Sequence, residues 1–331
     1  MPGDRVVAVG YGLGEESEQI TREVLGGDAE VAFLAGLPEG ERREVVRRAT
    51  AVLSWRPKGE FPGDMLARAE RLEFMQLLSA GVDHIDLTAI PGQAAVAGNV
   101  GAFAPPIAEH VLAMTLALAR RLPQRHAALA AGRWEQDKPL LTLDGAVCAV
   151  LGYGGIGKAT ARLMRALGAS IWAVNSTGTT DEPTGFTGTL ADLDRVLAAA
   201  DVLVISLPLT LATRGLIGAR ELALMKPGAI LVNVARGDIV DEQALYEHLR
   251  ANPGFGAGLD VWWHEPTRRT PFRTDHPFFG LPNVIGSPHN SGTVAGVMQG
   301  AARMAAQNVR RHLRGEPVRG LVRREDYLVP G

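Results

Sequence analysis

The chain has 331 residues, a length that favours two domains, and its 34 basic and 36 acidic residues leave a formal net charge of −2. With 46% hydrophobic and 21% charged residues it can bury full cores, which excludes an intrinsically disordered chain. A near-neutral charge gives no global attraction for nucleic acid or an anionic membrane, so we expect neither as a partner. The single cysteine, Cys148, excludes a disulfide framework and a multi-cysteine metal site, and we expect no metal.

The amino-terminal residues contain no apolar stretch of the kind found in signal peptides. No apolar run reaches the roughly 20 residues that a membrane-spanning helix needs. We therefore expect a cytoplasmic protein.

The first part of the chain alternates short apolar strands with helices. Strands are expected at residues 5–9, 31–34, 51–53 and 72–78, with helices at 16–25, 39–49 and 62–70 between them. This alternation is typical of parallel βαβ units. Prolines and glycines interrupt it around residues 90–106, and a long helix with few charges is expected at 107–121.

A second series of the same kind begins at residue 146. The sequence predicts strands at 146–151, 170–174, 202–206, 229–234, 256–261 and 284–285, helices at 156–167, 190–199, 219–225 and 241–250, and a last helix at 293–314. Two such series predict an α/β protein with two parallel sheets.

A glycine-rich turn in the second series has the spacing of a dinucleotide-binding site. Gly152, Gly154 and Gly157 form the pattern G-x-G-x-x-G between an apolar strand and a helix. The first glycine permits a tight turn, the second lets a pyrophosphate approach, and the third lets helix and strand pack closely. We therefore predict a dinucleotide site at this turn.

A second glycine-rich turn, at residues 10–14, is the weaker candidate. The position of a third glycine is taken by Glu15, and Glu16 follows it. Carboxylates at a helix N-terminus occupy the place where a pyrophosphate would bind, so we interpret this turn as structural.

The residues that follow the strand at 170–174 bear on the choice between NAD and NADP. An acidic residue there binds the ribose 2′-hydroxyl and repels a 2′-phosphate, but this chain has Asn175, Ser176 and Thr177. These neutral side chains can hydrogen-bond either cofactor, although Asn175 could also simply begin a loop. No arginine occurs between 175 and 194 to bind a phosphate. We expect NADP or NAD, with a preference for NADP.

Three later segments begin near the ends of predicted strands, where ligands bind in an open parallel sheet. They are 226–237, KPGAILVNVARG, 258–266, GLDVWWHEP, and 287–292, SPHNSG. With the loop 79–86, SAGVDHID, and the segment 206–210, SLPLT, they make the chain resemble the D-isomer-specific 2-hydroxyacid dehydrogenase family over nearly its whole length.

The resemblance implies a catalytic trio. Arg236 matches the arginine that orients the substrate, Glu265 the acid, and His289 the acid/base histidine that follows a proline. The chemistry agrees, because a guanidinium can bind a carboxylate and a carbonyl together, and an imidazole can exchange a proton near neutral pH. His264, next to Glu265, is the alternative acid/base residue.

The resemblance also implies the remaining contacts and the domain organisation. It implies a flavodoxin-like substrate domain, residues 1–98 and 291–331, and an inserted Rossmann NAD(P)-binding domain, residues 99–290, each a doubly wound parallel sheet. Asp260 resembles the acid that binds the nicotinamide carboxamide. The other implied cofactor contacts are Gly155, Ile156, Leu207, Pro208, Val234, Ala235, His289 and Gly292. The implied substrate contacts are Ala80, Gly81 and Val82, with Arg236.

Two further residues are candidates for the substrate site. Arg56 follows the strand at 51–53 and is either a substrate contact or a solvated surface arginine. Trp134 lies in the arm at 122–135, which in the family belongs to the dimer contact, so we expect a homodimer in which Trp134 shapes the partner's pocket.

The expected activity is an NAD(P)-dependent D-2-hydroxyacid dehydrogenase or 2-ketoacid reductase, with substrates of the glyoxylate or hydroxypyruvate type. Glu265 argues against formate dehydrogenases, which carry glutamine there, and nothing in the sequence supports phosphite oxidation. The alternative is a dinucleotide-sensing scaffold, like the corepressor relatives of the family. The sequence departs from the family at Ser206, Trp262 and Trp263, outside the trio.

Overall fold

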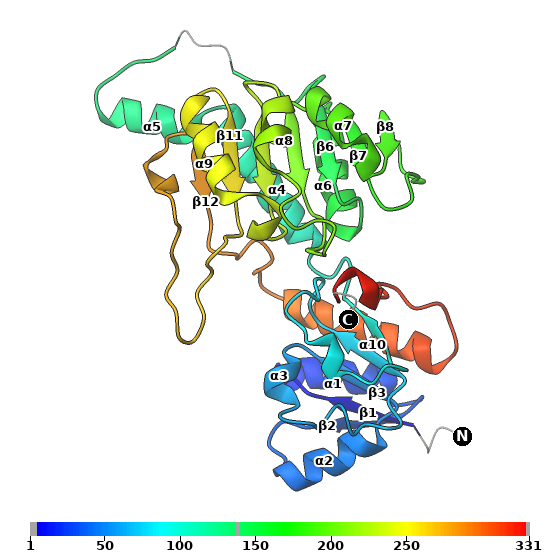
Figure 1. The fold of residues 1–331 in the computed structure, drawn as a ribbon. Coiled ribbons are helices and arrows are strands. Elements are labelled where there is room, and N and C mark those ends of the chain that lie inside the picture. Colours follow the sequence, from blue (N-terminus) through cyan, green and yellow to red (C-terminus); the bar gives the residue numbers. More distant parts are fainter. Residues whose placement is uncertain (1–4, 137–139, 329–331) are drawn as a thin grey trace. The chain divides into compact units, whose positions relative to one another are not determined.

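A computed structural model describes residues 5–136 and 140–328 of the chain. The chain forms two compact units (Figure 1). The terminal unit consists of residues 1–103 and 294–331, and the inserted unit consists of residues 104–293. The sequence placed the domain boundaries a few residues earlier, after residues 98 and 290, and the role expected for each domain stays a prediction.

The terminal unit contains a sheet of five parallel strands in the order β2-β1-β3-β4-β5. This is the flavodoxin-like order 2-1-3-4-5. The strands are β1 (Val6–Val9), β2 (Glu30–Phe33), β3 (Ala51–Ser54), β4 (Phe74–Leu77) and β5 (Ala95–Ala97), and the helices are α1 (Glu15–Leu25), α2 (Glu39–Arg48), α3 (Pro57–Glu60) and α10 (Val297–Leu313).

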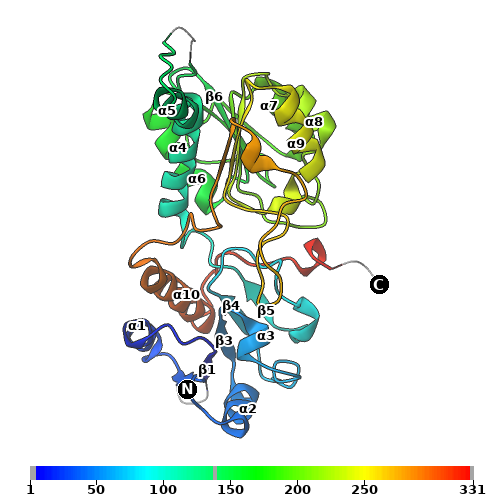
Figure 2. The same ribbon diagram turned by 90° about the vertical axis from the view of Figure 1, so that its left-hand side faces the viewer.

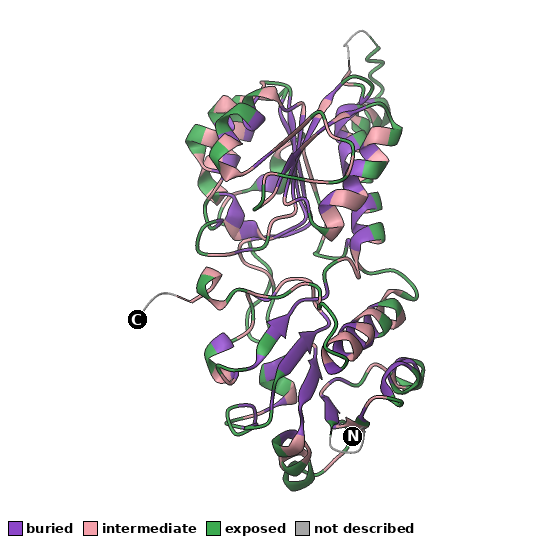
Figure 3. Ribbon diagram, turned by 90° about the vertical axis from the view of Figure 1, so that its right-hand side faces the viewer, coloured by how far each residue is buried: buried purple, intermediate pink, exposed green. Residues whose placement is uncertain are grey.

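Alternating side chains of the strands fill a core on each face of this sheet. On one face Val7 and Val9 belong to a cluster with Ala305 of α10, and α1 packs against α10. On the other face Ala8 belongs to a cluster with Val46 of α2. The central strands β1, β3 and β4 are accordingly buried along their whole length, whereas the edge strand β2 is exposed or half-buried (Figure 3).

The inserted unit contains a sheet of seven parallel strands in the order β12-β11-β10-β9-β6-β7-β8. The strands are β6 (Val147–Leu151), β7 (Ser170–Val174), β8 (Phe186–Gly188), β9 (Val202–Ile205), β10 (Ile230–Asn233), β11 (Gly256–Leu259) and β12 (Val284–Gly286). The helices are α4 (Ala104–Ala119), α5 (Leu122–Ala130), α6 (Gly155–Ala166), α7 (Leu193–Ala199), α8 (Ala219–Leu224) and α9 (Glu242–Ala251).

Numbered from β6, this order is that of a Rossmann sheet with one further strand, and it reverses between β6 and β9. The helices α4 and α6 pack together, and α4 also packs on β10 and β11, while α7 packs against α8 and α8 against α9 (Figure 2). Ligands of such sheets bind at the carboxyl ends of the strands. The expected fold class is therefore confirmed.

Some expected elements differ from those observed. The helix expected at 62–70 is wrong, because these residues form consecutive turns that bury the neighbours Met65 and Leu66 together with Ala69. The sequence did not predict β5, β8 or α5, which begins after Arg121 in a left-handed conformation (φ 49°). In the part of the chain that the structure describes, no helix is long and apolar enough to cross a membrane.

Candidate active site

The glycine turn after β6 has the geometry that a bound dinucleotide requires. Gly152 has φ +96°, and a Cβ on it would stand 2.6 Å from the backbone nitrogen of Leu207, in the loop after β9. A Cβ on Gly157 would overlap the carbonyl oxygen of Gly152 and stand 3.0 Å from Val150 Cγ1. A Cβ on Gly154 would meet no atom within 4 Å, which leaves room at the N-terminus of α6. The residues present therefore fit a pyrophosphate.

The glycine turn at residues 10–14 lacks this geometry. A Cβ on Gly10 would meet Glu60 Oε2 and the Phe61 ring, each at 2.8 Å, and Glu15, Glu16 and Glu18 lie in the first turn of α1. A side chain at position 10 would collide with Glu60 and Phe61, which explains the glycine. The acidic first turn of α1 disfavours a bound anion.

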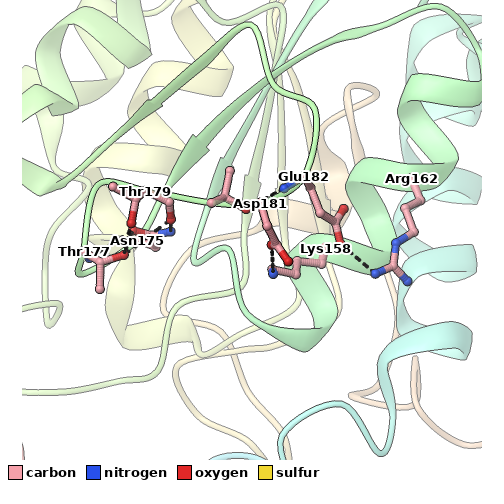
Figure 4. Close-up of polar contacts among 8 residues, drawn as sticks. Lys158, Arg162, Asn175, Thr177, Thr179, Asp181 and Glu182 are labelled. Carbon is pink, nitrogen blue, oxygen red and sulfur yellow. Dashed lines mark hydrogen bonds and ion pairs between the residues drawn. The ribbon is translucent and has the colours of Figure 1, made fainter.

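The loop after β7 is organised by Asn175 (Figure 4). Its Oδ1 accepts hydrogen bonds from the backbone nitrogens of Thr177, at 3.0 Å, and Gly178, at 2.7 Å, and its Nδ2 donates to the carbonyl oxygen of Thr179 at 2.8 Å. Ser176 and Thr177 are exposed. Asn175 thus holds the loop, and its Oδ1 also accepts from the Thr177 hydroxyl at 3.0 Å.

Two ion pairs join this loop to α6 (Figure 4). Lys158 Nζ lies 3.1 Å from Asp181 Oδ1, and Arg162 Nη2 lies 2.6 Å from Glu182 Oε1. The side chain of Asp181 is 88% exposed. Of these carboxylates, Glu182 is the one that is mostly buried, and its arginine partner compensates its charge.

The expected catalytic residues all follow adjacent strands of the inserted unit. Arg236 comes after β10, Glu265 after β11 and His289 after β12, and these strands pair side by side. His289 Nδ1 lies 2.7 Å from Glu265 Oε2 and 2.9 Å from its Oε1. Arg236 is half-buried and donates to the carbonyl oxygen of Ala235 at 2.7 Å. The parallel sheet therefore brings together groups that are up to 53 positions apart (289 − 236) in the chain.

The charge state of Glu265 follows from its surroundings. Burial raises the pKa of Glu265, but the hydrogen bond and charge of His289, the Trp262 amide and the charge of Arg236 outweigh burial, so that this pKa lies below its usual value. The carboxylate is therefore ionised at neutral pH and can accept a hydrogen bond from Nδ1 of the imidazole beside it.

Asp260 is completely buried and fixes the loop that carries His289. Its carboxylate accepts hydrogen bonds from Ser287 Oγ at 2.6 Å and from the amides of Asn290 and Ser291 at 3.1 and 3.2 Å. Its carbonyl oxygen accepts from the amide of His289 at 2.8 Å. Burial raises the pKa of Asp260, but these hydrogen bonds outweigh burial and hold it below its usual value. The contact to a nicotinamide carboxamide stays a prediction.

His264, the alternative acid/base residue, has a different partner. Its Nε2 lies 3.0 Å from Asp275 Oδ2. The neighbouring tryptophans are packing residues: the indole of Trp262 donates to the Ser287 carbonyl at 2.9 Å, and that of Trp263 to the Val240 carbonyl at 2.7 Å. Each histidine thus has its own carboxylate partner, and the choice of His289 as the acid/base residue stays a prediction.

The remaining predicted cofactor contacts also lie at loops of the inserted unit. Leu207 and Pro208 follow β9, Val234 and Ala235 follow β10 and are buried, and Gly292 follows the His289 loop. Ser206 donates to the Gly152 carbonyl at 2.8 Å, which ties the loop after β9 to the glycine turn.

The predicted substrate loop lies in the terminal unit, after β4. Ser79 Oγ donates to the Gly81 carbonyl at 2.9 Å, and a Cβ on Gly98 would overlap the Ala80 carbonyl. Among the described residues no oxygen accepts from the amides of Gly81 or Val82, which leaves two donors for an anion. Val82 itself is buried.

Arg56 and Trp134 are both exposed. Arg56 begins α3 after β3, the neighbour of β4, and its guanidinium lies over the Trp55 ring at 5.1 Å from the centroid. Trp134 is 80% exposed and its indole lies 3.3 Å from Gln136 Oε1. Their predicted roles at the substrate stay predictions.

One residue at the site, His110 of α4, was not predicted from the sequence. Its Nε2 lies 2.9 Å from Ser287 Oγ. It lies directly before the uncharged segment 111–119 of that helix, a segment that predicts burial and says nothing of a catalytic loop.

The fold and the site define an α/β protein with a dinucleotide turn and an acid/base pair at one sheet edge. A family model described as "D-isomer specific 2-hydroxyacid dehydrogenase, NAD binding domain" matches residues 112–291. The chain belongs to the D-isomer specific 2-hydroxyacid dehydrogenase family, which confirms the resemblance found in the sequence.

Several characterised relatives and solved structures are similar to the chain. It is 33% identical to the D-3-phosphoglycerate dehydrogenase of Methanocaldococcus jannaschii over 94% of this chain and 58% of that protein. It is 32% identical to the glyoxylate reductase of Thermococcus gammatolerans over 80% of each. A D-isomer specific 2-hydroxyacid dehydrogenase from Xanthobacter autotrophicus, solved with NADPH and MES, superposes with a TM-score of 0.77 at 28% identity over 98% and 99% of the two chains. The chain spans about half the length of the phosphoglycerate dehydrogenases it matches.

Proposed function

We propose that this protein is an NAD(P)-dependent D-2-hydroxyacid dehydrogenase that acts as a 2-ketoacid reductase on glyoxylate- or hydroxypyruvate-type substrates. The observation that carries the proposal is the His289–Glu265 pair, 2.7 Å apart, which stands after β12 and β11 in the unit that holds the glycine turn. A glyoxylate reductase and a glycerate dehydrogenase are among the relatives that match about four fifths of their own length.

In the reducing direction, the glycine turn after β6 would hold the pyrophosphate of a reduced nicotinamide cofactor, which when bound would supply the hydride for the 2-carbon of the keto acid. Arg236 binds the substrate carboxylate and the adjacent carbonyl, which its planar fork suits. His289 donates a proton to the carbonyl oxygen, so that the carbonyl becomes a hydroxyl group. Glu265 stays ionised and orients the imidazole through its contact with Nδ1.

The chain's own residues also bind the two reactants. The amides of Gly81 and Val82 hold the carboxylate, and Asp260 accepts from the nicotinamide carboxamide while it fixes the His289 loop. Because Asn175 carries no charge to repel a 2′-phosphate, NADPH is used at least as well as NADH.

The protein forms a homodimer in the cytoplasm. Leu122 and Leu129 of α5 and Trp134 of the arm are 57%, 56% and 80% exposed, which is an unusual amount of apolar surface for one short segment. Light scattering at micromolar concentration should give twice the mass of the chain, and replacing Leu122 and Leu129 together by Ser should give the single mass. A stable wild-type monomer would contradict this prediction.

A panel of substrates tests the activity. Glyoxylate, hydroxypyruvate and pyruvate are assayed with NADH and with NADPH, and D-glycerate and D-3-phosphoglycerate in the oxidising direction. We expect turnover of at least one small keto acid and loss of it in Arg236→Ala. Binding of the cofactor without turnover of any substrate would instead favour the dinucleotide-sensing scaffold.

A further inference from the structure

A chain of three polar side chains connects α4 to the loop that carries His289. His110 Nε2 lies 2.9 Å from Ser287 Oγ, and Ser287 Oγ lies 2.6 Å from Asp260 Oδ1. His110 Nε2 is 3.8 Å from the same carboxylate oxygen, so the serine hydroxyl bridges the two groups. The contact joins residues 177 positions apart in the chain.

The positions of the protons follow from the donors and acceptors. An ionised carboxylate only accepts, so the single hydroxyl proton of Ser287 points to Asp260. Ser287 Oγ then offers only lone pairs to His110, and Nε2 of His110 must carry a proton. The alternative, with Ser287 donating to His110, would need a protonated Asp260, although two backbone amides also donate to that carboxylate.

This chain of hydrogen bonds bears on a strained loop. His289 has φ +51°, a left-handed conformation that a non-glycine residue adopts only when its surroundings enforce it. The groups that Asp260 binds come from Ser287, before His289, and from Asn290 and Ser291, after it. A change in the Ser287–Asp260 contact therefore changes how firmly the His289 imidazole is held.

We propose that His110 is a positioning residue for the reaction: it donates its Nε2 proton to Ser287, which orients the serine hydroxyl toward Asp260 and so fixes the loop that carries His289. The proposal rests on the proposed function, because it assigns His110 a role in catalysis by His289. His110 itself touches neither of the residues of the His289–Glu265 pair in the contacts of the described chain.

A double-mutant cycle tests the connection. Loss of one neutral hydrogen bond in His110→Phe should lower kcat roughly fivefold to tenfold. Ser287→Ala removes a hydrogen bond to a buried charge, and kcat should fall about tenfold to hundredfold. Because His110 acts through Ser287, the double variant should match Ser287→Ala within about twofold. The KM for the keto acid should change less than about threefold, since other residues bind the carboxylate.

Two further variants separate positioning from a structural role. His110→Gln can place an amide donor near the position of Nε2, so kcat should return to within about threefold of the wild type. Thr115→Val removes another buried polar group of α4, whose hydroxyl bonds only to the Val111 carbonyl at 2.7 Å, and should leave kcat within about twofold. Additive losses in the cycle, an unchanged kcat in His110→Phe, or no recovery in His110→Gln would overturn the proposal.

A measurement independent of activity completes the test. In ¹⁵N-histidine NMR spectra of the whole protein, the signals absent from His110→Gln identify His110, and they should show a proton on Nε2. An unprotonated Nε2 would overturn the proposal whatever the activity of the variants. If the wild type turns over no keto acid, the proposed function fails, and the NMR result alone decides whether the hydrogen-bonded chain exists.

Discussion

The inserted unit places one polar side chain after β7 and another after β11, and both organise a loop. Asn175 accepts two backbone amides of the loop that follows it, and Asp260 accepts two backbone amides of the loop after β12. Asp260 is charged and completely buried, whereas Asn175 is neutral and half-buried. The same hydrogen-bonding task is thus performed with a charge at one position and without one at the other.

The difference shows what the charge adds. At Asp260, a carboxylate holds a strained histidine in place, and its buried charge is tolerated because three donors hydrogen-bond to it. At Asn175 a carboxylate could accept the same two amides, but it could not donate to the Thr179 carbonyl and would repel a phosphate on the adenosine ribose. We infer that the loop after β12, which Asp260 holds, is built for rigidity and the loop after β7 for tolerance toward the cofactor.

The largest effect is expected when the imidazole of His289, whose loop Asp260 fixes, is removed. His289→Ala should lower kcat by about 10²- to 10⁴-fold while the protein still folds, because the reaction loses its acid/base. His264→Ala is the matched control, since His264 pairs with Asp275, and should retain near-full turnover. Steady-state kinetics with one keto acid shows which histidine is the acid/base residue, and circular dichroism shows whether each variant is folded. Near-full activity in His289→Ala and loss in His264→Ala would show that the assignment is wrong.

A second, smaller effect tests the charge of Asp260 through stability. The pKa of Asp260 is lowered in the folded protein. The ionised carboxylate therefore makes its full contribution to the stability of the folded protein above the ordinary aspartate pKa near 4, and this contribution is lost as the pH falls through the lowered pKa. At pH 7, Asp260→Asn should reduce the free energy of unfolding by about 1.5 to 3 kcal/mol, the cost of losing hydrogen bonds to a charged group.

Urea unfolding of both proteins at pH 7, 5 and 3.5 measures this. The difference between wild type and Asp260→Asn should be the same at pH 7 and 5 and smaller at pH 3.5. A control variant, Asp181→Asn, changes an aspartate that is 88% exposed and should barely alter stability at pH 7. A constant difference down to pH 3.5 would mean that the charge of Asp260 contributes nothing.

Much of this arrangement could be predicted from the sequence, because it depends on local patterns. The apolar strands and the G-x-G-x-x-G pattern predict that Gly152 and Gly157 lie in the turn between a strand and a helix. Because ligands of a parallel sheet bind at the carboxyl ends of its strands, Arg236 and His289, which both follow strands, are predicted at one edge. The turns at 62–70 have a helical composition, and only packing in the core decides against a helix.

Contacts across the fold could not be predicted in this way. Nothing near His110 in the chain indicates Ser287, because their meeting depends on how α4 packs against the sheet. Likewise, the sequence showed that Asn175 lacks a charge, but not that its amide is engaged by the loop. Side-chain partners far apart in sequence need the three-dimensional structure.

The smallest effect concerns the cofactor and Asn175. Its Oδ1 is engaged by the amides of Thr177 and Gly178, so discrimination depends on the remaining hydroxyl and amide donors of the loop. One or two neutral hydrogen bonds of about 0.5–1.5 kcal/mol each imply roughly twofold to hundredfold selectivity, with NADPH used at least as well as NADH. Asn175→Asp should shift the ratio of kcat/KM toward NADH by about tenfold or more, since a carboxylate repels the 2′-phosphate.

The control variant Asn175→Ala loosens the loop without adding charge, and should weaken the binding of both cofactors alike. The ratio is measured with both cofactors and one keto acid, and a wild-type preference for NADH above about a hundredfold would contradict the prediction, because neutral hydrogen bonds alone would not explain it.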